Sequence, residues 1–353
     1  MESMNILVIT DKLIFGGAEM YFCKLENQLH DPNINFHYAA GSGELYEKIK
    51  HKNSFSEISR TKHLQNIKKL KKILITKEID LIHANSLRMV LYFIFIKKLT
   101  KKNFKIVYTK HNVTVLEEKN RFLFSHLLNK YVDRIITVSD FEKFNLVNAG
   151  IKPNKITTVY NGVDLQQFVF HRKEKGGTFN VGILARLSEE KNHELFINIA
   201  HQLRDVPNLM FYIAGDGPEY QKLKNIIRTL NLSHRIKMVG IVHKPEEFIK
   251  SMNLLLLTSY REVFPMVILE AMAVGTPIIS IDRGGIKEAI IENKTGFLIN
   301  NHSVDDFCKK ILFIESEEQV WNQCIENARR KVEEEFSLDQ MVSNTLQEYW
   351  KCN

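Results

Sequence analysis

The stretch from Asn253 to Leu298 limits most strongly what this chain can fold into, because strands and a helix alternate in it at short spacing. It opens with four leucines, Leu254–Leu257, a continuous apolar run typical of a buried parallel strand. A helix is predicted over Met266–Val274, with Pro265 at its first position because proline has no N–H to leave unpaired there. A second strand is predicted over Pro277–Ile281. This alternation favours an α/β fold with a parallel sheet.

The same alternation runs through the rest of the chain. Further strands are predicted over 5–10, 35–40, 79–83, 104–109, 134–139, 155–160, 179–184, 208–214 and 235–240. A chain of 353 residues exceeds the size at which one core stops growing. We therefore predict two Rossmann-like domains, over residues 1–165 and 166–335, followed by a helical segment over 336–353.

Polar residues gather where the predicted strands end, which is where parallel α/β sheets bind their ligands. Glu262 and Glu270 follow the four-leucine strand, and their carboxylates suit the vicinal hydroxyls of a ribose or sugar. Arg186 and Lys191 follow strand 179–184, and a guanidinium with an ammonium suits a diphosphate. His111 follows strand 104–109 and can donate to a sugar hydroxyl or a phosphate. Solvated surface charges and a histidine bonded to loop backbone are the structural alternatives.

Three glycine-containing loops extend the set of candidates. Gly16 and Gly17 lie at a strand-to-helix turn, where glycine permits close approach of a phosphate and a tight turn is the alternative. Gly215 lies in a G-D-G-P-E loop that allows close approach of a nucleotide. Ile241 follows the strand over 235–240.

Residues 253–298 resemble the E-x7-E region of family 4 of the retaining glycosyltransferases, which have the GT-B fold. The resemblance is carried by Glu262, Phe264, Glu270, Ala271, Met272, Gly275, Pro277, Gly284, Gly285, Glu288, Gly296 and Phe297. The F-G-G-A-E loop at 15–19, the N-G-V-D turn at 161–164 and the Arg186–Lys191 spacing are also similar to the family. Val263, Ala185 and Asn192 stand where the family usually has glycine.

The resemblance implies a GT-B protein with two Rossmann-like domains facing a central cleft, in which the final helix packs back on the N-terminal domain. The first domain would bind the acceptor and the second the nucleotide-sugar. The catalytic residues implied are Glu262, His111, Arg186 and Lys191. The donor-binding residues implied are Gly16, Gly17, Arg186, Lys191, Gly215, Ile241, Glu262, Val263, Phe264, Pro265 and Glu270. No essential metal and no other cofactor is expected, and the reaction would proceed by front-side attack.

The distribution of charged residues along the chain indicates which kinds of partner the protein can bind. Residues 1–165 carry 26 Lys and Arg against 16 Asp and Glu, a net charge of +10, whereas the remainder carries −2. This asymmetry favours an anionic partner such as a membrane face or an anionic polymer. Leu64–Thr76 predicts a helix with Leu64 on its apolar face and four lysines on the other. The basic cluster has no interleaved aromatic residues, so no nucleic acid is expected.

The chain opens on a predicted strand rather than a secretory segment, and its four cysteines lack C-x-x-C spacing. A cytoplasmic protein is expected, with the inner face of the membrane as an added location. The predicted function is transfer of a sugar, with a UDP-sugar favoured and an N-acetylhexosamine among the candidates, to a glycan, lipid-linked or cell-wall polymer acceptor. A catalytically silent partner of another transferase and a sugar-nucleotide epimerase are the rival hypotheses.

Overall fold

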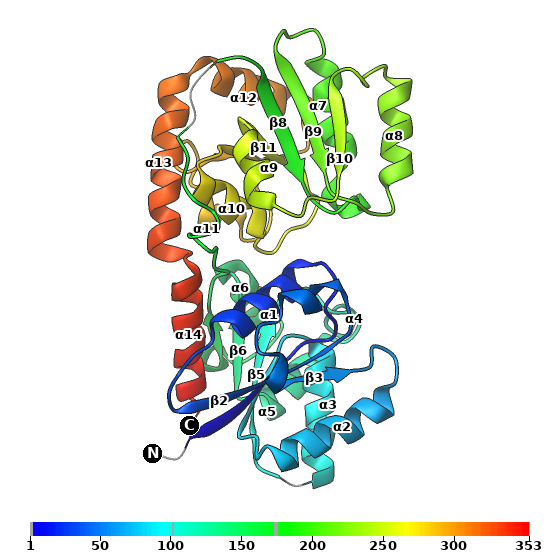
Figure 1. The fold of residues 1–353 in the computed structure, drawn as a ribbon, viewed down its shortest axis with the longest axis vertical. Helices are drawn as coiled ribbons and strands as arrows, with labels where there is room; N and C mark the ends of the chain where they lie inside the picture. Colours follow the sequence, from blue (N-terminus) through cyan, green and yellow to red (C-terminus); the bar gives the residue numbers. More distant parts are fainter. Residues whose placement is uncertain (1–2, 101, 173–175, 353) are drawn as a thin grey trace. The chain divides into compact units, whose positions relative to one another are not determined.

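The computed structural model describes residues 3–100, 102–172 and 176–352, and it divides into two compact units. The first unit comprises Met1–Asn161 with Leu338–Asn353, and the second comprises Gly162–Ser337. Each unit is an α/β layer structure around its own parallel sheet (Figure 1). The divisions at 161/162 and 337/338 lie close to the expected boundaries at 165/166 and 335/336.

The first unit contains a seven-stranded parallel sheet in the order β3-β2-β1-β4-β5-β6-β7. Its strands are β1 (Met4–Ile9), β2 (Ile34–Gly41), β3 (Phe55–Ile58), β4 (Leu81–Ala84), β5 (Lys105–Lys110), β6 (Arg134–Thr137) and β7 (Ile156–Thr158). Its α-helices are α1 (Gly17–Gln28), α2 (His63–Thr76), α3 (Leu87–Thr100), α4 (Val115–Lys119), α5 (Arg121–Tyr131), α6 (Asp140–Asn148) and α14 (Leu338–Trp350).

Alternate residues of β1 show how this sheet is covered. Leu7 and Ile9 belong to a core that also holds buried residues of α2, α3 and α5, whereas Ile6 and Val8 belong to a core with residues of α1 and α14. Successive side chains of a strand point to opposite faces, so the two helix sets cover opposite faces of the sheet. The C-terminal helix α14 is thus part of the first unit's core.

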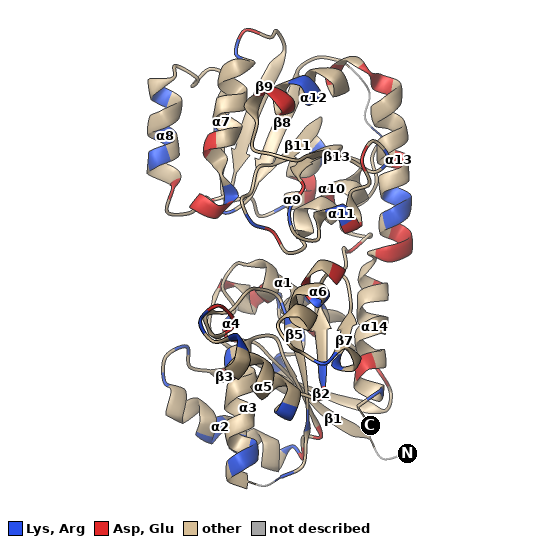
Figure 2. Cartoon of the chain, turned by 180° about the vertical axis from the view of Figure 1, so that it is seen from behind, with Lys and Arg blue, Asp and Glu red and all other residues tan. Residues whose placement is uncertain are grey.

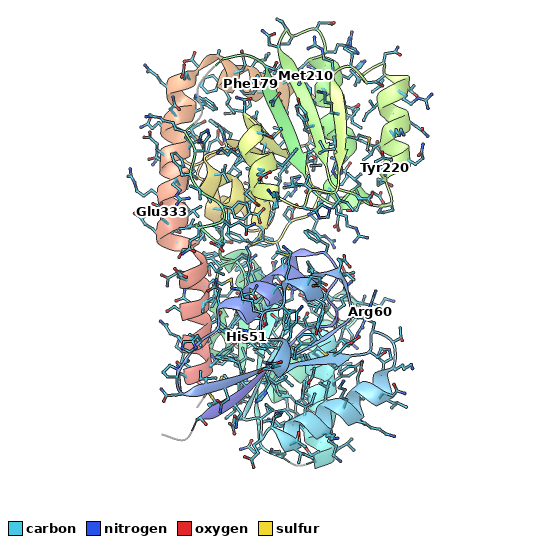
Figure 3. The ribbon with its side chains drawn as sticks, in the orientation of Figure 1. His51, Arg60, Phe179, Met210, Tyr220 and Glu333 are labelled. Atoms are coloured by element: carbon cyan, nitrogen blue, oxygen red, sulfur yellow. The ribbon has the colours of Figure 1, made fainter. Side chains whose placement is uncertain are left out.

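The second unit contains a six-stranded parallel sheet in the order β10-β9-β8-β11-β12-β13. Its strands are β8 (Phe179–Leu184), β9 (Leu209–Ala214), β10 (Ile236–Gly240), β11 (Leu254–Leu257), β12 (Ile278–Ile281) and β13 (Phe297–Ile299). Its α-helices are α7 (His193–Gln202), α8 (Tyr220–Thr229), α9 (Pro245–Ser251), α10 (Met266–Val274), α11 (Ile286–Ala289), α12 (Val304–Ser316) and α13 (Glu318–Glu335). In Figure 3, Phe179 marks the start of β8, and Tyr220 marks the start of α8.

Two local expectations need correction. Leu64 is 76% exposed although Asn66 in the same turn is buried, because Leu64 lies about 120° around the helix from Leu70, off the face that packs on the sheet. Pro265 is the N-cap of α10 rather than its first helical residue, with an extended backbone at ψ 128°. Among the described helices, none is both long and apolar enough to cross a bilayer.

Candidate functional site

The strand order of the second unit reverses between β8 and β11, because β8 continues to β9 and β10 on one side while β11 continues to β12 and β13 on the other. Open α/β sheets bind ligands at such a switch point, outside the carboxyl ends of the two strands. Arg186 and Lys191 lie in the loop after β8, and Glu262 lies in the loop after β11. These three sequence-predicted residues therefore lie where the topology opens the sheet.

The loop after β8 is shaped by Asn192. This residue has a left-handed backbone (φ 50°, ψ 52°) and caps α7 by accepting a hydrogen bond from the Leu195 N–H at 3.3 Å. Asparagine adopts this conformation more readily than other residues with a side chain. The structure thus explains how Asn192 replaces glycine: it keeps the turn and adds a helix cap.

Lys191 and Glu262 form an ion pair, with 2.8 Å between Lys191 Nζ and Glu262 Oε1. The same carboxylate oxygen accepts a hydrogen bond of 2.6 Å from Ser259 Oγ. Thr258 fastens the two loops together, since its buried hydroxyl lies 3.0 Å from the carbonyl oxygens of both Lys191 and Asn192. Lys191, which was predicted to bind the diphosphate, and Glu262, which was predicted to bind the sugar, therefore contact each other in this structure.

Arg186 is exposed, and its guanidinium has no hydrogen-bond or ion-pair partner among the described residues. Its five donors are available to an incoming anion. A guanidinium left open beside a partly buried ammonium, as at Lys191, gives this loop a concentration of positive charge suited to a diphosphate.

The start of α10 completes this edge of the second sheet. The helix has no side-chain cap, so its first N–H groups remain available to an anion. Glu270 lies half-buried in the second turn of the same helix. Phe264 is buried against Phe336, with ring centroids 5.5 Å apart, so its side chain serves the core and only its backbone is available to the site. Val263 does not have a positive φ.

Glycines hold the loops of this site in backbone contact. A Cβ on Gly215 would lie 2.0 Å from the Ala185 carbonyl oxygen, and one on Gly284 would lie 1.9 Å from the Glu262 carbonyl oxygen. Both positions also have positive φ, 135° and 61°. The reason given for Gly215 from sequence, close approach of a nucleotide, is therefore incomplete, because its α-carbon is packed against the neighbouring loop. Ile241 follows β10 and is 61% exposed.

In the first unit the strand order reverses between β1 and β4. Gly16 and Gly17 follow β1 and start α1, and a Cβ on Gly17 would meet nothing within 4 Å. The Glu19 carboxylate lies over Gly16, where a Cβ would come within 2.4 Å of its Oε2. The helix start that was predicted to contact a diphosphate thus faces a protein carboxylate in this structure.

His111 follows β5 and is partly buried, and its Nε2 lies 3.3 Å from Oδ1 of Asn85. The ring makes an edge contact with Tyr21, with centroids 4.6 Å apart. Burial, aided by the nearby Lys110 ammonium, lowers the pKa of His111 to about 3. The imidazole is therefore neutral at physiological pH and is available for hydrogen bonds rather than for charge interactions.

Beside His111, the Lys110 ammonium is fully buried between two carboxylates. It pairs with Glu142 of α6 and lies 3.2 Å from Glu117 of α4. Thr114 and Glu117 form a capping box at the start of α4. This cluster fastens α4 and α6 to the end of β5 and so fixes the segment that carries His111.

The sequence interpretation missed Asn85, Thr258 and Ser259 as site residues. All three follow strands that flank a switch point. Their position after a strand was visible in the sequence, but the strand order that makes these particular ends important was not.

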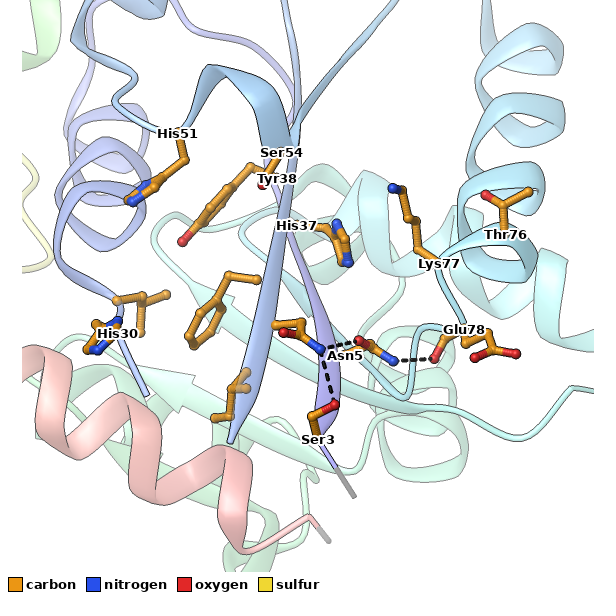
Figure 4. A pocket seen from close by; sticks show the side chains of 14 residues that line it. Ser3, Asn5, His30, His37, Tyr38, His51, Ser54, Thr76, Lys77 and Glu78 are labelled. Carbon is orange, nitrogen blue, oxygen red and sulfur yellow. Dashed lines mark hydrogen bonds between the residues drawn. The ribbon is translucent and has the colours of Figure 1, made fainter. Parts of the chain in front are cut away.

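A cavity of about 690 Å³ lies at the opposite edge of the first unit's sheet, near the amino ends of β1 and β2 (Figure 4). Its lining includes His30, His37 and His51, and none of the predicted site residues. It is therefore separate from the candidate site. Among the described residues, no group of three or more His, Cys, Asp or Glu side chains is placed to hold a metal ion.

Comparison with known proteins identifies the family. Residues 15–167 match the family described as Glycosyltransferase Family 4, and residues 166–331 match Glycosyl transferases group 1. The putative glycosyltransferase YtcC of Bacillus subtilis (strain 168) is 30% identical over 288 residues, which are 73% of this chain and 69% of YtcC. The N-acetyl-alpha-D-glucosaminyl L-malate synthase of Bacillus anthracis is 26% identical over 259 residues, 70% of this chain and 68% of that protein.

The fold also matches solved structures. Anabaena Alr3699/HepE in complex with UDP aligns with a TM-score of 0.84 at 20% identity, over 99% of this chain and 100% of that chain. The same protein was also solved with UDP-glucose. Two Rossmann-like units of this kind define the GT-B class. The chain belongs to the family 4, group 1 glycosyltransferases, which confirms the family and the fold class predicted from the sequence.

Proposed function

We propose that the protein is a retaining, metal-independent glycosyltransferase that uses a UDP-sugar donor. The observation that carries the proposal is the meeting of Arg186, Lys191 and Glu262 at the switch point of the second unit, beside the uncapped start of α10. The UDP complex of Anabaena Alr3699/HepE supports UDP as the nucleotide. The name of the Bacillus anthracis relative supports an N-acetylhexosamine among the candidate sugars.

In the proposed reaction an acceptor hydroxyl attacks the anomeric carbon on the face that the diphosphate leaves. The bond from the anomeric carbon to the phosphate oxygen breaks, the new bond to the acceptor oxygen forms, and the acceptor proton moves to the departing phosphate. Negative charge grows on the diphosphate as it leaves, and Arg186 with Lys191 would stabilise that charge. Glu270 would bind the ribose, and Glu262 the sugar hydroxyls. The roles of His111, Gly16, Gly17, Gly215, Ile241, Val263, Phe264 and Pro265 towards the donor stay predictions.

The acceptor is proposed to be a glycan, a lipid-linked precursor or an anionic cell-wall polymer, reached on the cytoplasmic face of a membrane. The support is the +10 net charge of residues 1–165 and one helical face of the first unit. On α3, Leu91, Phe95 and Leu99 are exposed at a spacing of four residues. The four lysines of the predicted basic cluster are exposed on α2, and Figure 2 colours lysines blue: Lys68, Lys69, Lys71 and Lys72.

Exposed apolar side chains on one helix with exposed lysines on a helix that contacts it suit the interface of an anionic bilayer. Co-flotation with phosphatidylglycerol vesicles tests this contact, with phosphatidylcholine vesicles as the control. Phe95→Glu is expected to weaken flotation, because it places a carboxylate in the apolar stripe. Equal flotation with neutral vesicles, or no loss in Phe95→Glu, would contradict the contact.

The reaction is tested by incubating the protein with UDP-sugars and following the products by proton NMR. Release of sugar or transfer to an added acceptor with the α-configuration retained is expected, and chelation by EDTA should leave the rate unchanged. An inverted product would refute the retaining mechanism. Tight UDP binding without hydrolysis or transfer of any donor would favour the catalytically silent alternative.

A further inference from the structure

Asn85 occupies the switch point of the first unit, directly after β4. It is 3% exposed, and its backbone N–H donates to the Ile9 carbonyl at 2.8 Å. Its side chain lies between two polar groups: Nδ2 is 3.5 Å from the Ile9 carbonyl oxygen, and Oδ1 is 3.3 Å from Nε2 of His111. A buried asparagine placed in this way connects the end of β1 to the histidine after β5.

The Ile9 carbonyl determines which way the Asn85 amide faces. If the amide were turned over, its oxygen would face another carbonyl oxygen, and two acceptors would meet without a proton. The amide NH₂ therefore faces Ile9, and the amide oxygen faces His111. An amide oxygen only accepts, so His111 Nε2 must carry the proton that is donated to it.

The other nitrogen of the His111 ring remains open. Nδ1 has no hydrogen-bond partner among the described residues and is not among their buried unpaired nitrogens, so it is accessible. In a neutral imidazole whose Nε2 carries the proton, Nδ1 holds a lone pair and accepts hydrogen bonds. The charged or titratable groups near this ring are Lys110, beside it in the chain, Tyr21 of α1, whose ring contacts it, and the buried His83 of β4.

We propose that Asn85 is a positioning residue that holds His111 as the Nε2–H tautomer, so that Nδ1 accepts a hydrogen bond from a substrate hydroxyl. The proposal rests on the proposed function in one respect only, the contact of His111 with substrate. The tautomer itself is a property of the free protein. It follows from the contacts of Asn85 alone.

His83 offers an internal control in the same unit. Its Nδ1 lies 2.6 Å from the Tyr349 hydroxyl of α14, and its Nε2 lies 2.6 Å from the Thr109 hydroxyl. These partners do not involve Asn85, so a change at Asn85 should leave the protonation pattern of His83 as it is. Asn66 offers a matched control variant, since it is an equally buried asparagine that bonds to the backbone of Ser59.

The experiment is nitrogen-15 NMR of the full chain labelled on its histidine rings, with the His111 signals assigned by their loss in His111→Gln. In the wild type we expect His111 to carry its proton on Nε2. In Asn85→Ala this preference should fall toward a mixture of tautomers, while His83 stays unchanged. Asn85→Asp keeps an acceptor and should keep the Nε2–H form, but its negative charge should raise the pKa of His111. Asn66→Ala should leave His111 unchanged. A proton on Nδ1 in the wild type, or an unchanged tautomer in Asn85→Ala, would overturn the proposal.

Kinetic measurements test separately whether the His111 tautomer matters for the reaction, that is, whether Nδ1 contacts the substrate. Asn85→Ala should lower kcat by about twofold to tenfold, the effect of one net hydrogen bond, with little change in the KM for the donor. The rate of Asn85→Asp should acquire a new acid limb. The expected tautomer shift with unchanged kcat would overturn the part of the proposal that gives Nδ1 a substrate. If the wild type bound no nucleotide-sugar donor at all, the proposed function would be refuted, but the assignment of the His111 tautomer would still hold.

Discussion

Breaking the ion pair between Lys191 and Glu262 should change the binding affinities for UDP and for a UDP-sugar in opposite directions. The paired atoms are 2.8 Å apart, and the side chains are 22% and 8% exposed, so the pair is intermediate between a surface pair and a buried one. Glu262→Gln removes the carboxylate that holds Lys191 and that would repel a diphosphate. UDP should then bind more tightly, by about 1 kcal/mol or roughly fivefold.

A UDP-sugar should respond in the other direction, because it also loses the charged acceptor for its hydroxyls. Hydrogen bonds to charged groups contribute about 1.5–3 kcal/mol, so the loss exceeds the gain and binding should weaken by about twofold to thirtyfold. Isothermal titration calorimetry of both ligands on wild type and Glu262→Gln measures the two effects. Glu247→Gln, which breaks the exposed pair with Lys244 in the same unit, is the matched control and should change neither affinity. A change of the same sign and size for both ligands would refute the assigned roles.

Three further predictions concern stability, each measured by denaturant unfolding. Asn192→Ala should lose about 2–3 kcal/mol, through the lost helix cap and the strain of a left-handed alanine, whereas Asn192→Gly should lose only a few tenths. Burial lowers the pKa of His193 to about 4, so the unfolded chain takes up a proton near pH 6.5 that the folded site refuses. The free energy of unfolding should therefore fall as pH drops from 6.5 to 4. His193→Leu should remove roughly 3 kcal/mol of that fall without a loss of stability at pH 7. If His193→Leu showed the same dependence of stability on pH as the wild type, this explanation would be refuted. Lys110→Met should cost about 3–5 kcal/mol, because it leaves the Glu117 and Glu142 carboxylates buried without their cation; a loss below 1 kcal/mol would show that the cluster is not ionised.

The sequence predicted those elements whose apolar pattern is continuous. The strand over 254–257 and the helix over 266–274 were predicted with the bounds the structure shows, because the strand is buried along its whole length and the helix ends at a glycine. The strand over 179–184 was also predicted with its observed bounds, although only its central residues are buried. Phe55–Ile58 was missed, because this short edge strand has only one fully buried residue and so no apolar run. Edge strands of this kind are specified by pairing with the neighbouring strand rather than by their own composition.

The sequence was enough to predict where the site residues lie in the fold, but not which of them contact one another. The rule that ligands bind at the carboxyl ends of parallel strands selected Arg186, Lys191 and Glu262. The pairing of Lys191 with a residue 71 positions later could not be read from one sequence, because it depends on β8 and β11 being neighbours. Asn85 was passed over for the same reason, since its importance comes from the strand order around β1 and β4.

The most direct test of the account is the binding of UDP to the switch point of the second unit. Titration calorimetry should compare UDP with uridine, which lacks the diphosphate, on wild type and Arg186→Ala. We expect the wild type to bind UDP and Arg186→Ala to bind it about ten- to a hundredfold more weakly, because charge-assisted hydrogen bonds to the diphosphate are lost, with uridine binding unaffected. Equal UDP affinity in the two proteins, or no UDP binding by the wild type, would contradict the assignment of this site.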